Sequence, residues 1–370
     1  MMIFHFLGAN IPHHNRRVLQ FFECELLPHL KLEQHHFYVV GDCQLQVEFP
    51  KLNLVALPTK RAAAMRLIAD FRRNATACCL LHGQFNGWIW IAILLGLLPV
   101  NRCIWHIWGA DWYEQSRRWT FRLFYPIRRL AQQKLPEIWA TLGDLAAVKE
   151  RFPRRIGRDK VVYFPTKMGG GLKIEHSHIA SVQCDEQYLS NRPFTVLLGN
   201  SGDPTNLHLE AFSQIYQCLG SAVRIIVPMG YPANNTAYIA QVEAEARRFF
   251  SVEQVMVLDQ AVSFEQYFAL LKQCDVGYFN FKRQQGVGTI CLLLSQQIPV
   301  VLNDQNPFRL DLQATGVPFL VADMLSKAAV EKVKTILHQQ DLTALPFFPE
   351  RYRQRWTALL VELECQKNME

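Results

Sequence analysis

The chain has 370 residues, a formal net charge of +7 and a sequence pI near 8.9. Half of its residues are hydrophobic and 19% are charged, which excludes a disordered protein, while the length favours two domains. The basic charge suits an anionic partner such as a phosphate, a nucleic acid or a lipid head group. The ten cysteines include no C-x-x-C pair, which argues against a zinc site or a disulfide framework and favours a reducing compartment.

The first half of the chain alternates short apolar segments with helix-like segments. The apolar segments are 3–8, 37–42, 52–58, 78–83, 103–109, 138–143 and 161–166. Between them lie the helix-like segments 15–26, 60–73, 88–98, 119–134 and 144–152. The longest apolar run, 88–100, is shorter than a membrane-spanning helix and predicts a buried helix. Continuous apolar strands separated by helices are typical of a parallel sheet, so we expect a Rossmann-like domain over 1–168.

The alternation lapses over 169–192, where three glycines precede a segment of mixed polarity without a period. No G-K-[ST] follows these glycines, so the segment is interpreted as an interdomain linker. Beyond it, strands are expected at 194–200, 223–230, 255–259, 275–281, 298–303 and 317–323. Helices are expected at 206–219, 234–250, 263–274, 288–297 and 350–366. We therefore expect a second Rossmann-like domain over 193–345, and a C-terminal helix over 346–370 that packs back on the first domain.

The fold class predicted is α/β, with two Rossmann-like domains facing a cleft. In such doubly wound sheets, ligands bind beyond the carboxyl ends of the strands. Residues at those ends are therefore the first candidates for a functional site.

A glycine turn in the second domain predicts an anion site. The strand over 275–281 leads into Lys282 and Arg283, then Gly286 and Gly288, and then a helix that begins near Thr289. The first amides of a helix lack internal partners, and glycine lets a phosphate approach them closely. The pattern also resembles a dinucleotide fingerprint, although the third glycine is replaced and a cationic insert precedes the turn. We favour a nucleoside diphosphate over NAD; a purely structural helix start is the third interpretation.

Two other strand ends of the second domain are candidate donor contacts. One carries Asn200, Ser201 and Gly202, and the other carries Met229 and Tyr231, whose backbone amides and ring could meet a nucleobase. A structural interpretation is equally open at both places, because Asp203, Asn206 and Asn235 are common helix-capping residues.

The first domain carries candidate bases at its strand ends. These are Asp111 and His14, which we place first, followed by His13, His82 and His106. A carboxylate or imidazole with a suitable pKa could deprotonate an attacking hydroxyl, although a lone histidine is more often structural. His13 and His14 are expected on a loop. Neither their spacing nor any H-E-x-x-H or D-x-D motif predicts a metal site.

The segment 117–134 combines basic and aromatic residues and contains no acidic residue. Such a mixture suits the interface of an anionic bilayer, and the basic residues predicted to face the membrane or acceptor are Arg117, Arg118, Arg122, Arg128 and Arg129. RNA contact is an alternative, but no nucleic-acid-binding module accompanies the segment. A helix with inward aromatic residues and solvated arginines is the structural alternative.

Taken together, the segments IPHHN, LHGQFN, WHIWGAD, FYPIRRLAQ, LGNSGD, IVPMGYPANNTAYI and RQQGVGTICLL resemble the N-acetylfucosaminyltransferase family of enterobacterial common antigen synthesis, a 4-alpha-L-fucosyltransferase type family. The likeness extends over nearly the whole chain. It implies a glycosyltransferase type B fold and a hexosyltransferase activity. The implied donor is dTDP-Fuc4NAc, which carries 4-acetamido-4,6-dideoxy-D-galactose, and the implied acceptor is the disaccharide ManNAcA-GlcNAc-diphospho-undecaprenol (lipid II), with lipid III as product.

The resemblance also implies a peripheral protein at the cytoplasmic side of the bacterial inner membrane, with no cofactor, no metal and no nucleic-acid partner. Many type B transferases have a glutamate in the helix after the glycines, where it binds ribose hydroxyls. Its approximate place here is Leu292, and a deoxyribose donor, which has one hydroxyl fewer, fits this departure. A catalytically inactive, membrane-docked protein that binds sugar nucleotides is the alternative, followed by an NAD-dependent enzyme. The sequence does not decide between inversion and retention, identify the base or give the oligomeric state.

Overall fold

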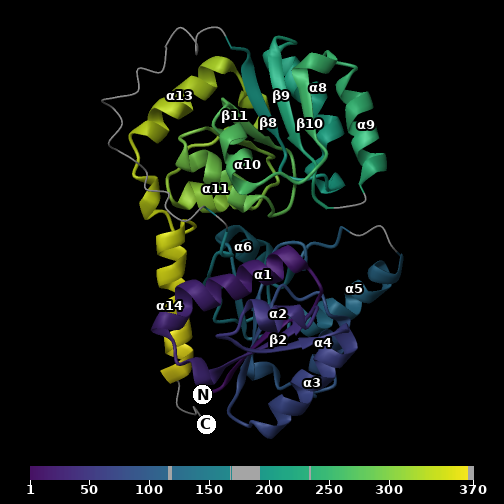
Figure 1. Cartoon of the computed structure of the whole chain (residues 1–370), viewed down its shortest axis with the longest axis vertical. Coiled ribbons are helices and arrows are strands. Elements are labelled where there is room, and N and C mark those ends of the chain that lie inside the picture. The colour runs from purple at the N-terminus through teal and green to yellow at the C-terminus, as the bar shows by residue number, and fades with distance from the viewer. Residues whose placement is uncertain (116–118, 167, 169–191, 233–234, 366–370) are drawn as a thin grey trace. The chain divides into compact units, whose positions relative to one another are not determined.

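The computed structural model describes residues 1–115, 119–166, 168, 192–232 and 235–365 (Figure 1). Its chain contacts divide it into two compact units. Unit 1 comprises Met1–Thr166 and Pro349–Glu370, and unit 2 comprises Lys167–Phe348. Nearly all of the predicted linker, 169–192, lies outside the described residues.

Unit 1 is built on a seven-stranded sheet, called sheet A here, with the order β3-β2-β1-β4-β5-β6-β7. All the neighbouring strands pair in parallel. The strands are β1 (Ile3–Leu7), β2 (His35–Val40), β3 (Asn53–Leu57), β4 (Cys78–His82), β5 (Cys103–His106), β6 (Glu137–Ala140) and β7 (Lys160–Val161). The seven strands expected from the sequence are therefore all present.

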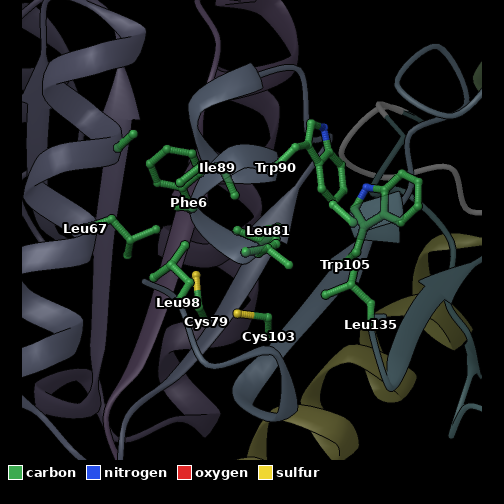
Figure 2. Close-up of a cluster of buried hydrophobic side chains, with 14 of the residues drawn as sticks. Phe6, Leu67, Cys79, Leu81, Ile89, Trp90, Leu98, Cys103, Trp105 and Leu135 are labelled. Carbon is green, nitrogen blue, oxygen red and sulfur yellow. The ribbon is translucent and has the colours of Figure 1, made fainter. Parts of the chain in front are cut away.

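Helices cover both faces of sheet A, which is why its strands are apolar throughout. They are α1 (Pro12–Phe21), α2 (Gln44–Glu48), α3 (Lys60–Arg73), α4 (Gly87–Leu94), α5 (Trp119–Gln132), α6 (Leu142–Arg151) and α14 (Pro349–Cys365). Figure 2 shows part of the core on one face, where Phe6 of β1 and Leu81 of β4 meet Leu67 of α3 and Ile89 of α4. On the other face, Trp356 of α14 packs on aromatic residues of unit 1.

Unit 2 repeats this design with the five-stranded sheet B, whose order is β10-β9-β8-β11-β12 and whose pairs are all parallel. Its strands are β8 (Phe194–Leu198), β9 (Val223–Pro228), β10 (Val255–Leu258), β11 (Val276–Phe279) and β12 (Val300–Leu302). Its helices are α8 (His208–Leu219), α9 (Thr236–Ala246), α10 (Phe264–Leu271), α11 (Val287–Ser295), α12 (Phe308–Ala314) and α13 (Lys327–His338). In Figure 1, α8 and α9 lie side by side next to β9 and β10.

Each sheet has a topological switch point, the place where the strand order reverses. In sheet A it lies between β1 and β4, and in sheet B it lies between β8 and β11. Ligands of open parallel sheets bind beyond the carboxyl ends of the strands at this point. The fold therefore marks one candidate region in each unit.

Two predicted elements differ in the structure. The segment 317–323 was expected to form a strand, but it makes only an isolated bridge between Leu320 and Val301. Pro318 has no amide hydrogen to donate, and a 3-10 turn, Ala322–Met324, ends the extended stretch. His13 and His14 were expected on a loop. They lie instead in the first turn of α1, which begins at Pro12, because proline has the backbone angle that a helix start requires.

Candidate functional site

In unit 2, hydrogen bonds tie the carboxyl ends of neighbouring strands of sheet B together. Beyond β8, the backbone amide of Asn200 donates to Oδ1 of Asn206 (3.1 Å), so this loop folds back on itself. Beyond β11, Oδ1 of Asn280 accepts from Nδ2 of Asn303, which follows β12 (2.9 Å). The amide of Gly202 donates to the carbonyl of Tyr231, which follows β9 (2.6 Å). The edge is therefore a connected, preorganised surface made by the ends of four strands.

The helix α11 begins at this edge with a glycine that no other residue replaces easily. Gly286 is its N-cap residue and has φ 65° and ψ 11°, in the left-handed region. A Cβ placed there would lie 3.0 Å from Cγ of Asn200, which brings the β8 and β11 loops into contact. Gly288 lies within the first turn of α11 and is partly exposed. The first amides of α11 therefore open at the switch point with no acidic residue in the first turn.

The two predicted cations differ in their surroundings. The Arg283 guanidinium is mostly buried, with 12% of its side chain exposed, and lies 3.9 Å from the Asp203 carboxylate. Its Nη2 donates to Oγ1 of Thr205 (3.1 Å). Lys282 is exposed. Arg283 is consequently positioned toward the β8 loop, whereas Lys282 is exposed to solvent.

Three buried polar atoms at this edge have no hydrogen-bond partner among the described residues: Oδ1 of Asn200, Nε2 of Gln285 and Nε2 of His208. His208 is fully buried at the start of α8, and a Cβ on Gly199 would lie 2.8 Å from its Nε2. Burial lowers the pKa of His208 to about 4, so its imidazole is neutral at pH 7. An unpaired buried polar atom costs about 1–3 kcal/mol, so a cluster of them suggests the place of a polar ligand.

Sequence reasoning missed His208, Gln285 and Thr205 as members of this region. Thr205 follows the loop already singled out, and Gln285 directly precedes the glycine turn, so their positions carried a signal. His208 carried none, because a histidine at a helix start has many structural roles.

Other predicted donor contacts are partly occupied by the protein itself. The amide of Met229 donates to the carbonyl of Leu258 (2.8 Å), so it is not available to a nucleobase as expected. The Thr289 hydroxyl pairs with the Tyr267 hydroxyl (3.2 Å). Ser201 accepts from Nδ2 of Asn206 (3.1 Å). Tyr231, by contrast, is about half exposed and presents its ring to solvent.

In unit 1, Asp111 is fully buried, and its carboxylate accepts three hydrogen bonds. The donors are the backbone amides of Gln84 (2.9 Å) and Trp108 (2.8 Å) and the indole Nε1 of Trp105 (2.8 Å). Burial raises the pKa of Asp111, while these bonds counteract the rise. The carboxylate thus fixes the loops after β4 and β5, which gives our first candidate base a positioning role.

The other predicted bases fall into two groups. His82 and His106 end β4 and β5 and are buried, and burial lowers the pKa of His82 to about 3. His14 is half-buried, and its pKa is lowered first by burial and then by the charge of exposed His13. The His14 ring lies against Trp108, with 5.4 Å between their centroids. Of the five candidates, His13 and His14 are the ones that reach the surface at the sheet edge.

An aromatic wall, made of His14, Trp108 and Phe164, lines this edge of unit 1. The Phe164 ring lies 5.2 Å from both the His14 and Trp108 rings, measured between centroids. Each of the three is partly exposed. Aromatic faces beside an imidazole are suited to contact with a sugar ring that carries a hydroxyl nucleophile.

In helix α5, the surroundings of Arg128 and Arg129 differ from the prediction that they face a membrane or an acceptor. Arg128 is buried, and it donates to the carbonyl of Trp112 (3.1 Å) and pairs with Glu114 (3.4 Å). Arg129 also pairs with Glu114. These two arginines therefore fix α5 to the preceding loop, together with Arg151 of α6, which lies 3.8 Å from the same mostly buried carboxylate. Arg122 is exposed as expected, whereas Arg117 and Arg118 lie outside the described residues.

The exposed face of α5 is apolar instead. Trp119, Leu123, Ile127 and Leu130 share this face at helical spacing, and Phe121 is exposed on another side of the helix. Trp88 and Leu95, at the two ends of α4, are also exposed, and α4 packs directly on α5. The structural alternative, in which the aromatic residues point inward, fails for Trp119 and Phe121.

Within the part of the chain that the structure describes, no group of three or more histidine, cysteine or carboxylate side chains could hold a metal ion. No described helix is both long enough and apolar enough to cross a bilayer.

Comparisons with known proteins identify the family and the fold of the chain. Residues 1–365 match the family described as 4-alpha-L-fucosyltransferase glycosyl transferase group 56. Among solved structures, the chain is similar to Anabaena HepE in complex with UDP, with 14% identity, coverage of 99% of this chain and 98% of that one, and a TM-score of 0.57.

Two further structures share the fold. The N-terminal domain of Candida albicans trehalose-6-phosphate phosphatase is 9% identical and gives a TM-score of 0.60, with coverage of 98% of this chain and 96% of that one. A UDP-forming alpha,alpha-trehalose-phosphate synthase from Burkholderia vietnamiensis is 13% identical and gives 0.51, with coverage of 96% and 88%. The predicted glycosyltransferase type B fold is confirmed. The chain belongs to the 4-alpha-L-fucosyltransferase family, glycosyl transferase group 56, and is a hexosyltransferase.

Proposed function

We propose that this glycosyltransferase moves 4-acetamido-4,6-dideoxy-D-galactose from its dTDP derivative to the lipid-linked disaccharide ManNAcA-GlcNAc-diphospho-undecaprenol. The observation that carries the donor half is the edge of sheet B. This edge contains Gly286, whose backbone is in the left-handed region, the first amides of α11 and the Arg283 guanidinium. It also contains three buried polar atoms that have no partner among the described residues. Family membership and the sequence resemblance support the sugar and the acceptor.

The leaving diphosphate would bind at this edge. As the bond between the anomeric carbon and the diphosphate oxygen breaks, negative charge develops on that oxygen. The amides of Val287 and Gly288 and the Arg283 guanidinium offer preorganised positive charge for it. Because the protein supplies this charge, we propose that transfer needs neither a metal ion nor a cofactor.

We propose that the nucleotide of the sugar donor is a deoxyribonucleotide. Leu292 lies buried in α11 where many type B transferases have a glutamate that binds ribose. A buried leucine offers nothing to a second ribose hydroxyl, and dTDP lacks that hydroxyl. Tyr231 offers an exposed ring for stacking on thymine.

In unit 1, the aromatic wall is the proposed acceptor contact. The acceptor hydroxyl forms the new bond to the anomeric carbon and releases its proton. We propose that His14 takes that proton, because it is the imidazole of the wall and is unprotonated at pH 7, although burial lowers its pKa to about 3 and so weakens it as a base. The products are dTDP, the extended lipid-linked oligosaccharide and one proton, so the equation balances without another reactant.

A lipid-linked acceptor requires contact with a membrane, and the face of α5 is suited to it. Trp119 and Leu123 are exposed on this helix beside Arg122. Large apolar side chains with flanking cations are the composition of helices that lie in a bilayer interface. We propose peripheral association with an anionic membrane through this face.

The test is transfer of radiolabelled sugar to the lipid-linked disaccharide, with and without EDTA. We expect dTDP-dependent transfer that EDTA leaves intact. Loss of activity on chelation, restored by magnesium, would contradict the metal-independent mechanism. Absence of transfer with this donor, together with transfer from UDP sugars, would refute the donor assignment.

A further inference from the structure

Five buried residues of unit 1 form a continuous chain of polar contacts that the proposed reaction does not use. Glu364 of α14 contacts His35 (2.8 Å), and His35 contacts His5 of β1 (2.9 Å). His5 contacts His82 (3.1 Å), and His82 contacts His106 (3.4 Å). We call these five residues the histidine relay. It links α14 to the carboxyl edge of sheet A.

The relay is closed to solvent. The four histidines are at most 1% exposed and Glu364 is 7% exposed. Phe22 and Trp356 pack on the imidazole rings from the helical side. Each contact must therefore be satisfied by the protons of the relay itself, since the rings expose almost no surface at which water could replace them.

The direction of the hydrogen bonds can be followed from Glu364 when its carboxylate is ionised. A carboxylate only accepts, so Nε2 of His35 must donate to it. A neutral imidazole has one donor and one acceptor, so Nδ1 of His35 then accepts from Nε2 of His5. In the same way, Nδ1 of His5 accepts from Nε2 of His82. Nδ1 of His82 is left with a bare lone pair that faces His106.

The hydrogen-bond directions that follow from Trp108, at the other end of the relay, conflict with this arrangement. The Trp108 indole Nε1 only donates, and it donates to Nδ1 of His106 (3.2 Å). That nitrogen must therefore be an acceptor as well. It is the same atom that faces Nδ1 of His82. Without a further proton, two buried lone pairs would face each other at 3.4 Å, which is repulsive.

We propose that the histidine relay binds one proton beyond those of four neutral imidazoles and an ionised carboxylate, and that this proton keeps Nδ1 of His82 protonated. Two arrangements place a donor at every contact of the relay, and in both of them Nδ1 of His106 shares its one lone pair between Trp108 and His82. In one, His82 is an imidazolium and Glu364 a carboxylate. In the other, Glu364 is a carboxylic acid that donates to His35, and the donors of His35, His5 and His82 are all Nδ1. A shift of protons along the chain interconverts the two, and both leave the relay without net charge.

The groups around the relay do not replace this proton. The backbone amide of Lys31 donates to Oε1 of Glu364 (2.7 Å), and Glu33 and His36 influence His35 at longer range. The amino group of Met1 lies 3.5 Å from the backbone carbonyl of Glu364. None of these groups lies at the His82–His106 contact, where the conflict arises. Burial lowers the pKa of His5, His82 and His106, which opposes the arrangement with an imidazolium at His82.

The relay ends at His106, which contacts Trp108, so the extra proton of the relay affects how the Trp108 indole is held. The Trp108 indole is held by Nδ1 of His106 only while that nitrogen accepts. A proton at Nδ1 of His82 keeps it an acceptor, and thereby fixes a ring of the aromatic wall. Glu364 is thus a positioning residue for Trp108, acting from the C-terminal helix through four histidines.

The test is the protonation state of His82 in the full-length protein, measured by nitrogen-15 NMR of imidazole-labelled protein at pH 7.5. We expect Nδ1 of His82 to give the chemical shift of a protonated nitrogen. A pyridine-type shift for this atom would overturn the proposal, because it is the state in which all four histidines are neutral and Glu364 is ionised.

Two variants test whether the Trp108 indole is the reason that Nδ1 of His82 carries a proton. Trp108→Phe removes the donor that makes His106 an acceptor, so Nδ1 of His106 can donate to His82, and we expect His82 to lose its Nδ1 proton. Retention of that proton in Trp108→Phe would overturn the account. His36→Gln is the matched control, since His36 neighbours His35 on β2 without belonging to the relay, and the His82 signal should stay unchanged. Loss of the Nδ1 proton in this control would also contradict the proposal.

Discussion

At the scale of single residues, burial and hydrogen bonding separate groups that look alike in the sequence. Asp111 and His14 were the two leading candidate bases. The structure surrounds Asp111 with three donors in the interior and leaves His14 half-buried on an aromatic wall. The sequence could predict that both lie near one sheet edge, because strand ends share an edge. It could not predict their accessibility, which depends on the loops that fold over them.

Replacing Asp111 and His14 should therefore have different effects. Asp111→Asn puts an amide group among three N–H donors, so we expect a loss of stability of about 2–4 kcal/mol. His14→Ala should leave the melting temperature nearly unchanged and lower kcat by about tenfold or more. Thermal unfolding and steady-state kinetics on both variants distinguish them. A stable Asp111→Asn protein with a large loss of kcat would restore Asp111 as the base.

Arg283 and Lys282 make a second contrasting pair. Arg283 is held toward the β8 loop by Thr205 and Asp203, while Lys282 is exposed. Arg283→Ala should lower kcat by roughly a hundredfold, or about 3 kcal/mol, with a smaller rise in KM, because the charge it stabilises develops as the diphosphate leaves. Lys282→Ala, the control, should change kcat by less than threefold. The reverse result would mean that the wrong cation was chosen.

At the scale of elements, period and composition predicted most strands and helices. The apolar strands are recognisable because both faces of each sheet are covered. The errors have local causes. Pro12 marks the start of α1, and this signal was overlooked. Helix α13 was also missed, although Ser326 caps it and Val330, Val333 and Leu337 repeat at helical spacing.

The ion pairs of helix α5 could not be predicted from the sequence. Its composition predicted a helix, which the structure contains, and a contact with the membrane through its arginines. The structure assigns Arg128 and Arg129 to Glu114, an acidic residue that lies before the helix. Which charges are used internally depends on this tertiary contact. An interface through α5 must then depend on its exposed apolar side chains more than on these arginines.

The double variant Trp119→Ser/Leu123→Ser tests this assignment. The two side chains are 71% and 67% exposed. Each large apolar side chain buried in a membrane interface contributes about 1.5–3 kcal/mol, so binding to phosphatidylglycerol vesicles should fall by more than tenfold in co-sedimentation. Ile156→Ser, at another highly exposed position of unit 1, is the matched control and should bind like the wild type. Equal binding by the double variant would exclude α5 as the contact.

At the scale of the whole molecule, a buried histidine outside the relay makes stability depend on pH. Burial lowers the folded-state pKa of His208 to about 4. The unfolded chain binds a proton at this residue below about pH 6.5, so its contribution to stability is complete above that pH and is lost as the pH falls toward the folded-state value. At pH 5 His208 should cost about 2 kcal/mol.

Chemical denaturation at pH 7.5, 6 and 5 measures this dependence. We expect the unfolding free energy to fall steadily across the series. His208→Gln should flatten part of the slope, because it removes one titrating group from unit 2. A free energy that does not change between pH 7.5 and 5 would contradict the burial of neutral imidazoles.

The binding of dTDP, measured by isothermal titration calorimetry in the presence of EDTA, tests the central claim most directly. The claim is that the carboxyl edge of sheet B holds the diphosphate of a deoxyribonucleotide donor without a metal. We predict one site per chain, at least tenfold weaker binding in Arg283→Ala, and unchanged binding in Lys282→Ala. Binding of NAD in place of dTDP, a strict requirement for magnesium, or full affinity in Arg283→Ala would contradict it.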